Sequence, residues 1–129
     1  MKITADFLTD PALQSVLSML QTGGHRALIV GGAVRNALLD QPVGDVDIAT
    51  DAAPERVVTL AHAAGLKVHP WTFRRENYFL PLADKGGLNP AGHGDLAAEI
   101  DMYLKTGIDG LFSDNPREAV PAVQAGAKR

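Results

Sequence analysis

The sequence predicts an α/β fold, a three- or two-layer sandwich of about four mainly parallel or mixed strands with alternating helices. Helical and strand patterns alternate along residues 9–73, which is typical of a sheet covered by helices. The run Ile29-Val-Gly-Gly-Ala-Val also reads as a buried strand, a tight turn and the start of a helix. The length of 129 residues indicates a single domain over residues 1–129.

The N-terminal helix has clear start and stop signals. Thr9 or Asp10 can cap its first turn, and Pro11 suits the first helical position. The pair Gly23-Gly24 ends it. Its apolar side chains recur at intervals of three and four residues and form one stripe, made by Leu13, Val16, Leu17 and Leu20.

Four strands are predicted from short apolar or alternating patterns, at Arg26–Val30, Asp45–Thr50, Leu66–Phe73 and Ile108–Ser113. The helices between and after them are expected over 33–39, from Pro54 to Gly65, from Asp95 to Gly107, and from Asn115 onward. Pro121 lies inside the last helix, where proline typically costs ~3 kcal/mol. We therefore expect that helix to be kinked or frayed, with residues 124–129 loose.

Residues 74–94 interrupt this alternation. They show no helical or strand period and contain Pro81, Gly86-Gly87, Pro90 and Gly92. A structureless loop of this length is uncommon in a compact domain and is usually functional or disordered.

The composition excludes several classes of function. A net charge of −3 leaves no basic footprint for nucleic acid, which argues against tRNA binding. The absence of cysteine excludes disulfides, thiolate metal sites and a cysteine nucleophile. No apolar run is long enough to span a membrane and no signal peptide is present, so we expect a soluble, cytoplasmic protein with no membrane partner.

Five residues between Ile29 and Thr50 are the candidate site. Asp45 and Asp47 are two residues apart on a predicted strand, so both carboxylates share a face and can hold Mg²⁺ between them. Gly31 and Gly32 allow a close backbone approach to a phosphate at the next helix, and Arg35 can add a charged contact. Metal and phosphate together suggest nucleotidyl transfer.

The first part of the chain resembles the head domain of bacterial tRNA CCA-adding nucleotidyltransferases. The residues that carry the resemblance are Leu28-Ile-Val-Gly-Gly-Ala-Val-Arg35, Gly44-Asp-Val-Asp-Ile-Ala-Thr-Asp51 and Pro54-Glu-Arg-Val. It covers residues 1–68, and Asn36 departs from the usual aspartate. It implies that Asp45 and Asp47 are the metal pair, with Gly31, Gly32 and Arg35 as the triphosphate cradle.

The second part, residues 62–129, resembles the C-terminal end of glycerophosphodiester phosphodiesterases, which are TIM-barrel enzymes. The carrying segments are Ala64-Gly-Leu-Lys-Val-His-Pro-Trp-Thr-Phe73, Arg75-Glu-Asn77 and Thr106-Gly-Ile-Asp-Gly-Leu-Phe-Ser-Asp-Asn-Pro116. The two resemblances meet within residues 62–68, where both families place a helix end, a glycine and a strand start. We interpret the chain as a chimera, engineered or otherwise recombined.

Both resemblances imply incomplete sites. The nucleotidyltransferase family's base-selecting motifs are absent, and the phosphodiesterase family's catalytic histidines and metal ligands would lie in a part of the barrel that this chain lacks. We therefore expect no native enzymatic function, no catalytic residues and no cofactor. The alternative is residual Mg²⁺-dependent binding of a nucleoside triphosphate. A third hypothesis is a glycerophosphodiester-binding fragment acting through residues 74–93.

Simpler readings exist for most of these residues. Asp45 and Asp47 can be solvated acids, and Arg74-Arg75 a solvated pair. Trp71 and Phe73 alternate along a strand, which favours the core over ligand stacking. Four strands would leave two open sheet edges, so we expect a homodimer through an exposed edge.

Overall fold

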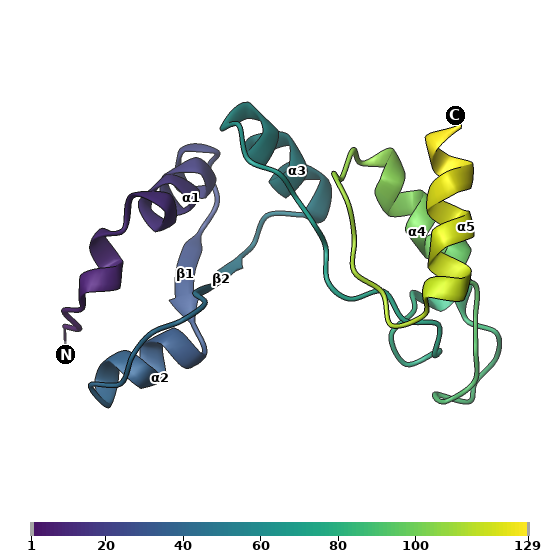
Figure 1. Ribbon diagram of the computed structural model, residues 1–129, viewed down its shortest axis with the longest axis horizontal. Helices are drawn as coiled ribbons and strands as arrows, with labels where there is room; N and C mark the ends of the chain where they lie inside the picture. The colour runs from purple at the N-terminus through teal and green to yellow at the C-terminus, as the bar shows by residue number, and fades with distance from the viewer. Residues whose placement is uncertain (1, 129) are drawn as a thin grey trace. The chain divides into compact units, whose positions relative to one another are not determined.

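The computed structural model describes residues 2–128, which divide into an N-terminal unit ending at Leu66 and a C-terminal unit beginning at Lys67 (Figure 1). Helices and a two-stranded sheet make up its regular structure, which agrees with a mixed α/β composition. The boundary between the units falls within residues 62–68, the segment in which the two resemblances meet.

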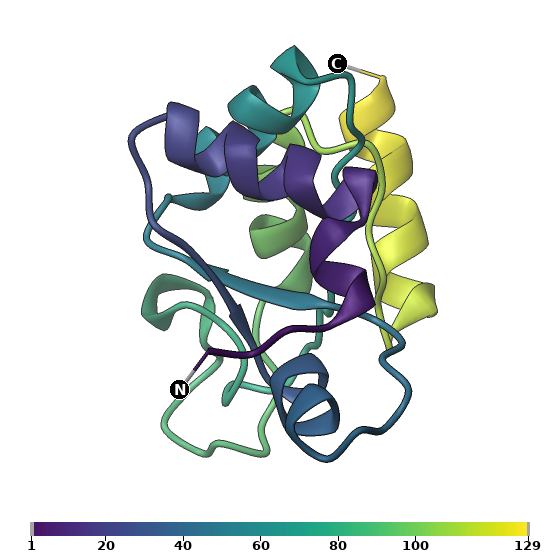
Figure 2. The ribbon, with the colours of Figure 1, turned by 90° about the vertical axis from the view of Figure 1, so that its left-hand side faces the viewer.

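The N-terminal unit contains one 3-10 helix, three α-helices and both strands. In Figures 1 and 2, α1 and α3 lie toward one end of the sheet and α2 lies toward the other. The elements are η1 (Asp6–Thr9), α1 (Pro11–Thr22), β1 (Ala27–Val30), α2 (Gly32–Leu38), β2 (Asp47–Thr50) and α3 (Pro54–Ala63).

Helix α1 forms as its capping pattern predicts. The Asp10 carboxylate accepts a hydrogen bond from the Leu13 backbone N–H at 3.0 Å, which satisfies one of the free donors of the first turn. Leu13 and Leu20 of the apolar stripe are buried. The stripe therefore faces the core of the unit, as expected.

Strands β1 and β2 are antiparallel, whereas mainly parallel or mixed strands were expected. Ala27 lies opposite Thr50, and Val30 lies opposite Asp47. The cause lies in the connection after α2, where Asp40 has a φ of 51° and Asn36 donates to the Pro42 carbonyl at 2.9 Å. This turn brings the chain back to the end of β1 that it left, so β2 runs in the opposite direction.

The Asp51 carboxylate joins the two strands at the end of the sheet where β1 begins and β2 ends. Asp51, just after β2, accepts hydrogen bonds from the Arg26 backbone N–H at 2.9 Å and from its Nε at 3.2 Å. His25 Nδ1 lies 3.5 Å from the same carboxylate. The backbone and side-chain hydrogen bonds from Arg26 lower the pKa of Asp51 below its ordinary value of 3.8.

The substitution Asp51→Asn is expected to lower the melting temperature of the N-terminal unit at neutral pH. Because the folded pKa of Asp51 lies below its unfolded value, the ionised group stabilises the fold above the unfolded pKa, and this stabilisation is lost as the pH falls through the folded pKa. Melting curves across acid pH should therefore converge for the two proteins. A constant difference down to the lowest pH would contradict this role.

The C-terminal unit contains one 3-10 helix and two α-helices, η2 (Leu82–Asp84), α4 (Leu96–Lys105) and α5 (Pro116–Ala127). Asp95 caps α4 by accepting from the Ala98 N–H at 2.9 Å, as predicted. The rings of Phe73 and Tyr103 pack edge to face, with centroids 5.1 Å apart. The buried core of the unit consists of Phe73, Leu80, Leu96, Ile100 and Ala119.

Residues 66–73 and 108–113 run side by side but do not form the two strands that were predicted. They are joined by three backbone hydrogen bonds, and only Phe73 and Ser113 form a parallel bridge. Two donors are missing from a regular ladder. Pro70 has no N–H, and the Val68 N–H donates to the Asp109 side chain at 2.9 Å. The segments are therefore extended and paired without qualifying as strands.

The pattern of exposure along this segment also differs from the prediction. Phe73 is buried, as expected, but Trp71 is 81% exposed, so its placement in the core was wrong. Alternate residues share one face only in a regular strand, and this segment is irregular where Trp71 lies.

Asn77 organises much of the long loop at residues 74–94. Its side-chain amide donates to the Asn89 carbonyl at 2.8 Å and accepts from the Gly86 N–H at 2.8 Å. Its own N–H donates to the Gly92 carbonyl at 2.7 Å. With 2% of its surface exposed, Asn77 replaces the regular hydrogen bonds that the loop lacks.

Helix α5 continues through Pro121 to Ala127, so the loosening expected from residue 124 is not observed up to Ala127, and Arg129 lies outside the described residues. The proline removes one backbone donor, and the remaining turns still pack Ala119, Ala122 and Val123 against the core. Over residues 2–128, no helix combines the length and apolar character needed to cross a membrane.

Candidate functional site

The predicted phosphate cradle lies where β1 turns into α2. Gly31 has a φ of 73°, which favours glycine, and it precedes the first residue of α2, Gly32. A Cβ atom on Gly31 would lie 3.0 Å from Oδ2 of Asp47, so the turn also brings the backbone close to β2. The structure thus places Gly31 beside one of the two predicted metal ligands.

The Arg35 guanidinium is hydrogen-bonded to the side chain of its neighbour Asn36. Its Nε and Nη2 atoms donate to the Asn36 side-chain oxygen at 3.1 and 3.0 Å. Asn36 in turn donates to Pro42. Arg35 and Asn36 lie within α2, and their side chains link this helix to the turn that follows it. Asn36, which stands where the nucleotidyltransferase family usually has aspartate, is part of this link.

The two predicted metal ligands occupy different kinds of backbone. Asp47 opens β2, whereas Asp45 lies in a bend before the strand, so the strand alternation that would align them does not extend to Asp45. Both are exposed. Within residues 2–128, no three Asp, Glu or His side chains gather closely enough to hold a metal ion.

Replacing Gly31 with alanine is expected to cost about 1–3 kcal/mol of unfolding free energy in the N-terminal unit, because its φ of 73° is strained for other residues. The matched control is Gly32→Ala, where the added Cβ would meet only Arg35 Nη2, at 3.6 Å. That variant should stay within about 0.5 kcal/mol of the wild type in a denaturant titration. Equal losses in both variants would contradict this account.

Charged side chains gather at the C-terminal ends of the paired segments in the C-terminal unit. Arg74 Nε lies 3.3 Å from Asp114, and its Nη2 lies 3.5 Å from Glu76. The guanidinium also stacks over Phe79, 4.5 Å from the ring centroid. A hydrogen bond from its own backbone N–H, together with the charge of Arg74, lowers the pKa of Glu76.

Arg75 completes this polar cluster. Its Nη1 donates to Glu118 at 2.7 Å, and its backbone N–H donates to the Asn115 side chain at 3.0 Å. The prediction of a solvated Arg74-Arg75 pair was therefore wrong. Both arginines bind acids from the segment that opens α5. The sequence signal that the prediction overlooked is the set of acid and amide side chains at positions 114, 115 and 118.

Glu99 is a candidate that the sequence did not indicate. Burial, and secondarily the charge of Asp84, raise its pKa. Together with Trp71 and Tyr103 it lines a small cavity of about 90 Å³. In the sequence, Glu99 looks like any other polar residue of a helix, and no local pattern marks it as a candidate.

The family pattern of the glycerophosphoryl diester phosphodiesterases matches residues 5–118. The chain belongs to this family. The match reaches much further toward the N-terminus than the resemblance seen in residues 62–129. In the phosphodiesterase-like part, the matched residues include the polar cluster of Arg74, Glu76 and Asp114.

Parts of the same phosphodiesterase-family chain are also similar to CCA-adding enzymes. It is 50% identical over 46 residues to the CCA-adding enzyme of Bacillus mycoides strain KBAB4, covering 36% of this chain and 12% of that protein. It is 40% identical over 80 residues to that of Anoxybacillus flavithermus, covering 50% of this chain and 20% of that protein. The chain thus spans at most a fifth of the length of these two curated relatives. No solved structure matches it.

Proposed function

We propose that the chain is a composite α/β protein, recombined or engineered from fragments of two enzyme families, and that it turns over neither phosphodiesters nor nucleotides. The pairing within the polar cluster carries this proposal. Arg74 and Arg75 are bound by residues that open α5, and Glu76 pairs with Arg74. These contacts hold the paired segments, the loop and α5 together. Charges engaged in this way support a structural role.

Hydrolysis of glycerophosphocholine by the full chain, with Mg²⁺ or Ca²⁺ present, tests the proposal. The expected rate equals that of buffer alone. A rate above buffer that disappears in Glu76→Gln or Asp114→Asn would overturn the structural role of the cluster. Melting curves of the variants separate lost activity from lost folding, because a structural cluster predicts lower melting temperatures in both.

The alternative is weak binding of Mg²⁺ and a nucleoside triphosphate at Gly31, Gly32, Arg35, Asp45 and Asp47. It is not favoured, because Arg35 is bonded to Asn36 and Asp45 lies outside β2. Calorimetry with ATP and Mg²⁺ should give no heat of binding, either in the wild type or in Asp45→Ala/Asp47→Ala. Heat that is absent only from the double variant would establish the alternative. We expect no tRNA binding in either case.

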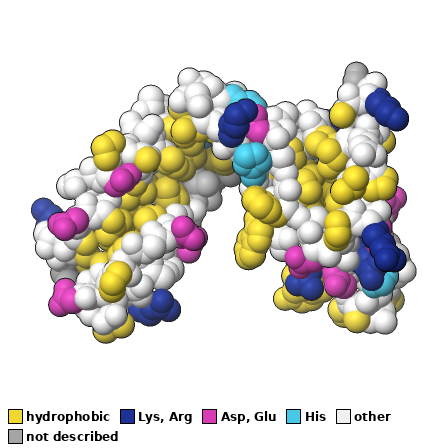
Figure 3. Space-filling model, viewed as in Figure 1, with side chains coloured by type: hydrophobic (Ala, Val, Ile, Leu, Met, Phe, Trp, Pro, Cys, Tyr) yellow, Lys and Arg dark blue, Asp and Glu magenta, His cyan; other side chains and the backbone are white. Residues whose placement is uncertain are grey.

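We propose that the partner of this chain is a second copy of itself, and that the two pair through an exposed sheet edge. With two strands in the sheet, β1 and β2 each have one unpaired edge. Figure 3 shows hydrophobic side chains gathered on the visible face of the N-terminal unit, and Leu28, Val30, Leu38 and Leu39 are exposed. Light scattering on concentrated protein should give twice the monomer mass, and a monomer at all concentrations would exclude the dimer.

A further inference from the structure

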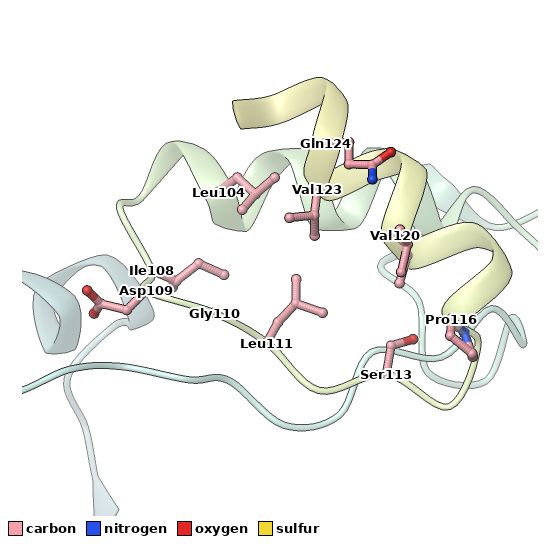
Figure 4. A pocket seen from close by; sticks show the side chains of 11 residues that line it. Leu104, Ile108, Asp109, Gly110, Leu111, Ser113, Pro116, Val120, Val123 and Gln124 are labelled. Atoms are coloured by element: carbon pink, nitrogen blue, oxygen red, sulfur yellow. The ribbon is translucent and has the colours of Figure 1, made fainter. Parts of the chain in front are cut away.

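The C-terminal unit contains a cavity of about 470 Å³ between α4, α5 and residues 108–113. This volume lies within the range of small-molecule sites. In Figure 4, Leu104 and Val123 lie on the helix side of the cavity and Leu111 points toward them from the opposite side. The apolar side chains that line it are Leu104, Ile108, Leu111, Pro116, Ala119, Val120 and Val123.

The side chains that line the cavity determine which kind of ligand body fits it. The side chains are aliphatic, and the lining contains no aromatic ring on which a flat ligand could stack. The walls come from leucine, isoleucine and valine side chains, whose dispersion contacts suit a saturated chain. Val120 remains 53% exposed, so the cavity is open to solvent at α5.

The polar groups of the lining determine which terminal group the ligand can carry. The Ser113 hydroxyl is already used, because it donates to the Phe73 carbonyl at 2.7 Å and accepts from the Asn115 N–H. The Asp109 side chain points away from the cavity in Figure 4 and binds the Val68 N–H. The amide of Gln124, exposed on α5, can both donate and accept.

We propose that this cavity binds one unbranched alkyl chain that ends in an uncharged hydroxyl or amide group. The chain lies against the aliphatic walls, and its polar end is held within the lining beside the Gln124 amide. A carboxylate end is disfavoured, because the lining contains no lysine, arginine or histidine and its one ionisable side chain, Asp109, is acidic. Neither the family pattern nor the relatives assign a ligand to this cavity.

Titration of the full chain with 1-hexanol, 1-heptanol and 1-octanol, followed by backbone amide NMR shifts, tests the proposal. Each added methylene should tighten binding about fourfold, as expected for burial of one CH₂ group. Octanoate should bind at least about tenfold more weakly than 1-octanol, the order of penalty expected for burying an unpaired charge. Absence of saturable shifts at Leu104, Ile108 and Val123, or equal binding of octanoate, would overturn the proposal.

A cavity-filling variant locates the ligand. Val120→Trp should abolish the octanol-dependent shifts, because its side chain extends into the cavity from an exposed position. The matched control is Met102→Trp, at a position on α4 that is 47% exposed and does not line the cavity. Binding retained in Val120→Trp contradicts the site. Shifts at the cavity that follow protein concentration without octanol would show instead that a second copy covers it.

Discussion

Replacing Ile100 with alanine is expected to unfold most of the C-terminal unit. Ile100 is fully buried on α4 and belongs to the cluster that also contains Phe73, Leu96 and Ala119. Truncating a buried isoleucine to alanine costs about 2–5 kcal/mol, through lost transfer free energy and the cavity left behind. The core of such a small unit rarely supplies more than about 3–5 kcal/mol, so the loss is comparable to its whole stability.

Amide NMR of the full chain measures this effect separately for each unit. In Ile100→Ala, the dispersed signals of residues 67–128 should collapse toward random-coil positions. Met102→Ala is the matched control, because Met102 lies two positions further on the same helix and is 47% exposed. It should cost less than about 0.5 kcal/mol. A similar collapse in both variants would show that helix propensity, and not burial of Ile100, holds the unit together.

Helices and their ends were predictable because their signals are local. Asp10 and Asp95 each precede an apolar stripe of helical period, and both side chains accept the expected hydrogen bond. Sheet pairing was less predictable, because it depends on residues far apart in sequence. The antiparallel direction of β2 depends on the turn that Asn36 and Asp40 make, and the sequence does not display that turn.

The paired segments at 66–73 and 108–113 show the same limit. Their apolar composition correctly indicates that they are extended, and Phe73 is buried as predicted. Pro70 was visible in the sequence, and its missing donor argues against a central strand. The competing bond from the Val68 N–H to Asp109, 41 residues away, could be found only in the folded structure.

The candidate site was predictable as a motif but not as a geometry. Gly31 has the positive φ that its place after a strand indicates, and it approaches Asp47. The bond between Arg35 and Asn36 depends on side-chain rotamers, and the start of β2 at Asp47 separates it from Asp45. Whether motif residues form one site is decided by these contacts, which residue identity does not specify.

The substitution Asn77→Ala is expected to destabilise the C-terminal unit by about 2–3 kcal/mol, because it leaves Gly86 N–H and the Asn89 carbonyl without their side-chain partner and opens a small cavity. Hydrogen exchange should rise first at Gly86 and Gly92, before any change in α5. The matched control is Asn89→Ala, which keeps the carbonyl that Asn77 binds and removes only an exposed bond to Ala91 at 3.1 Å. Its cost should stay below about 1 kcal/mol. Equal costs in the two variants would mean that water replaces the Asn77 amide, and that the loop is ordered by its chain ends alone.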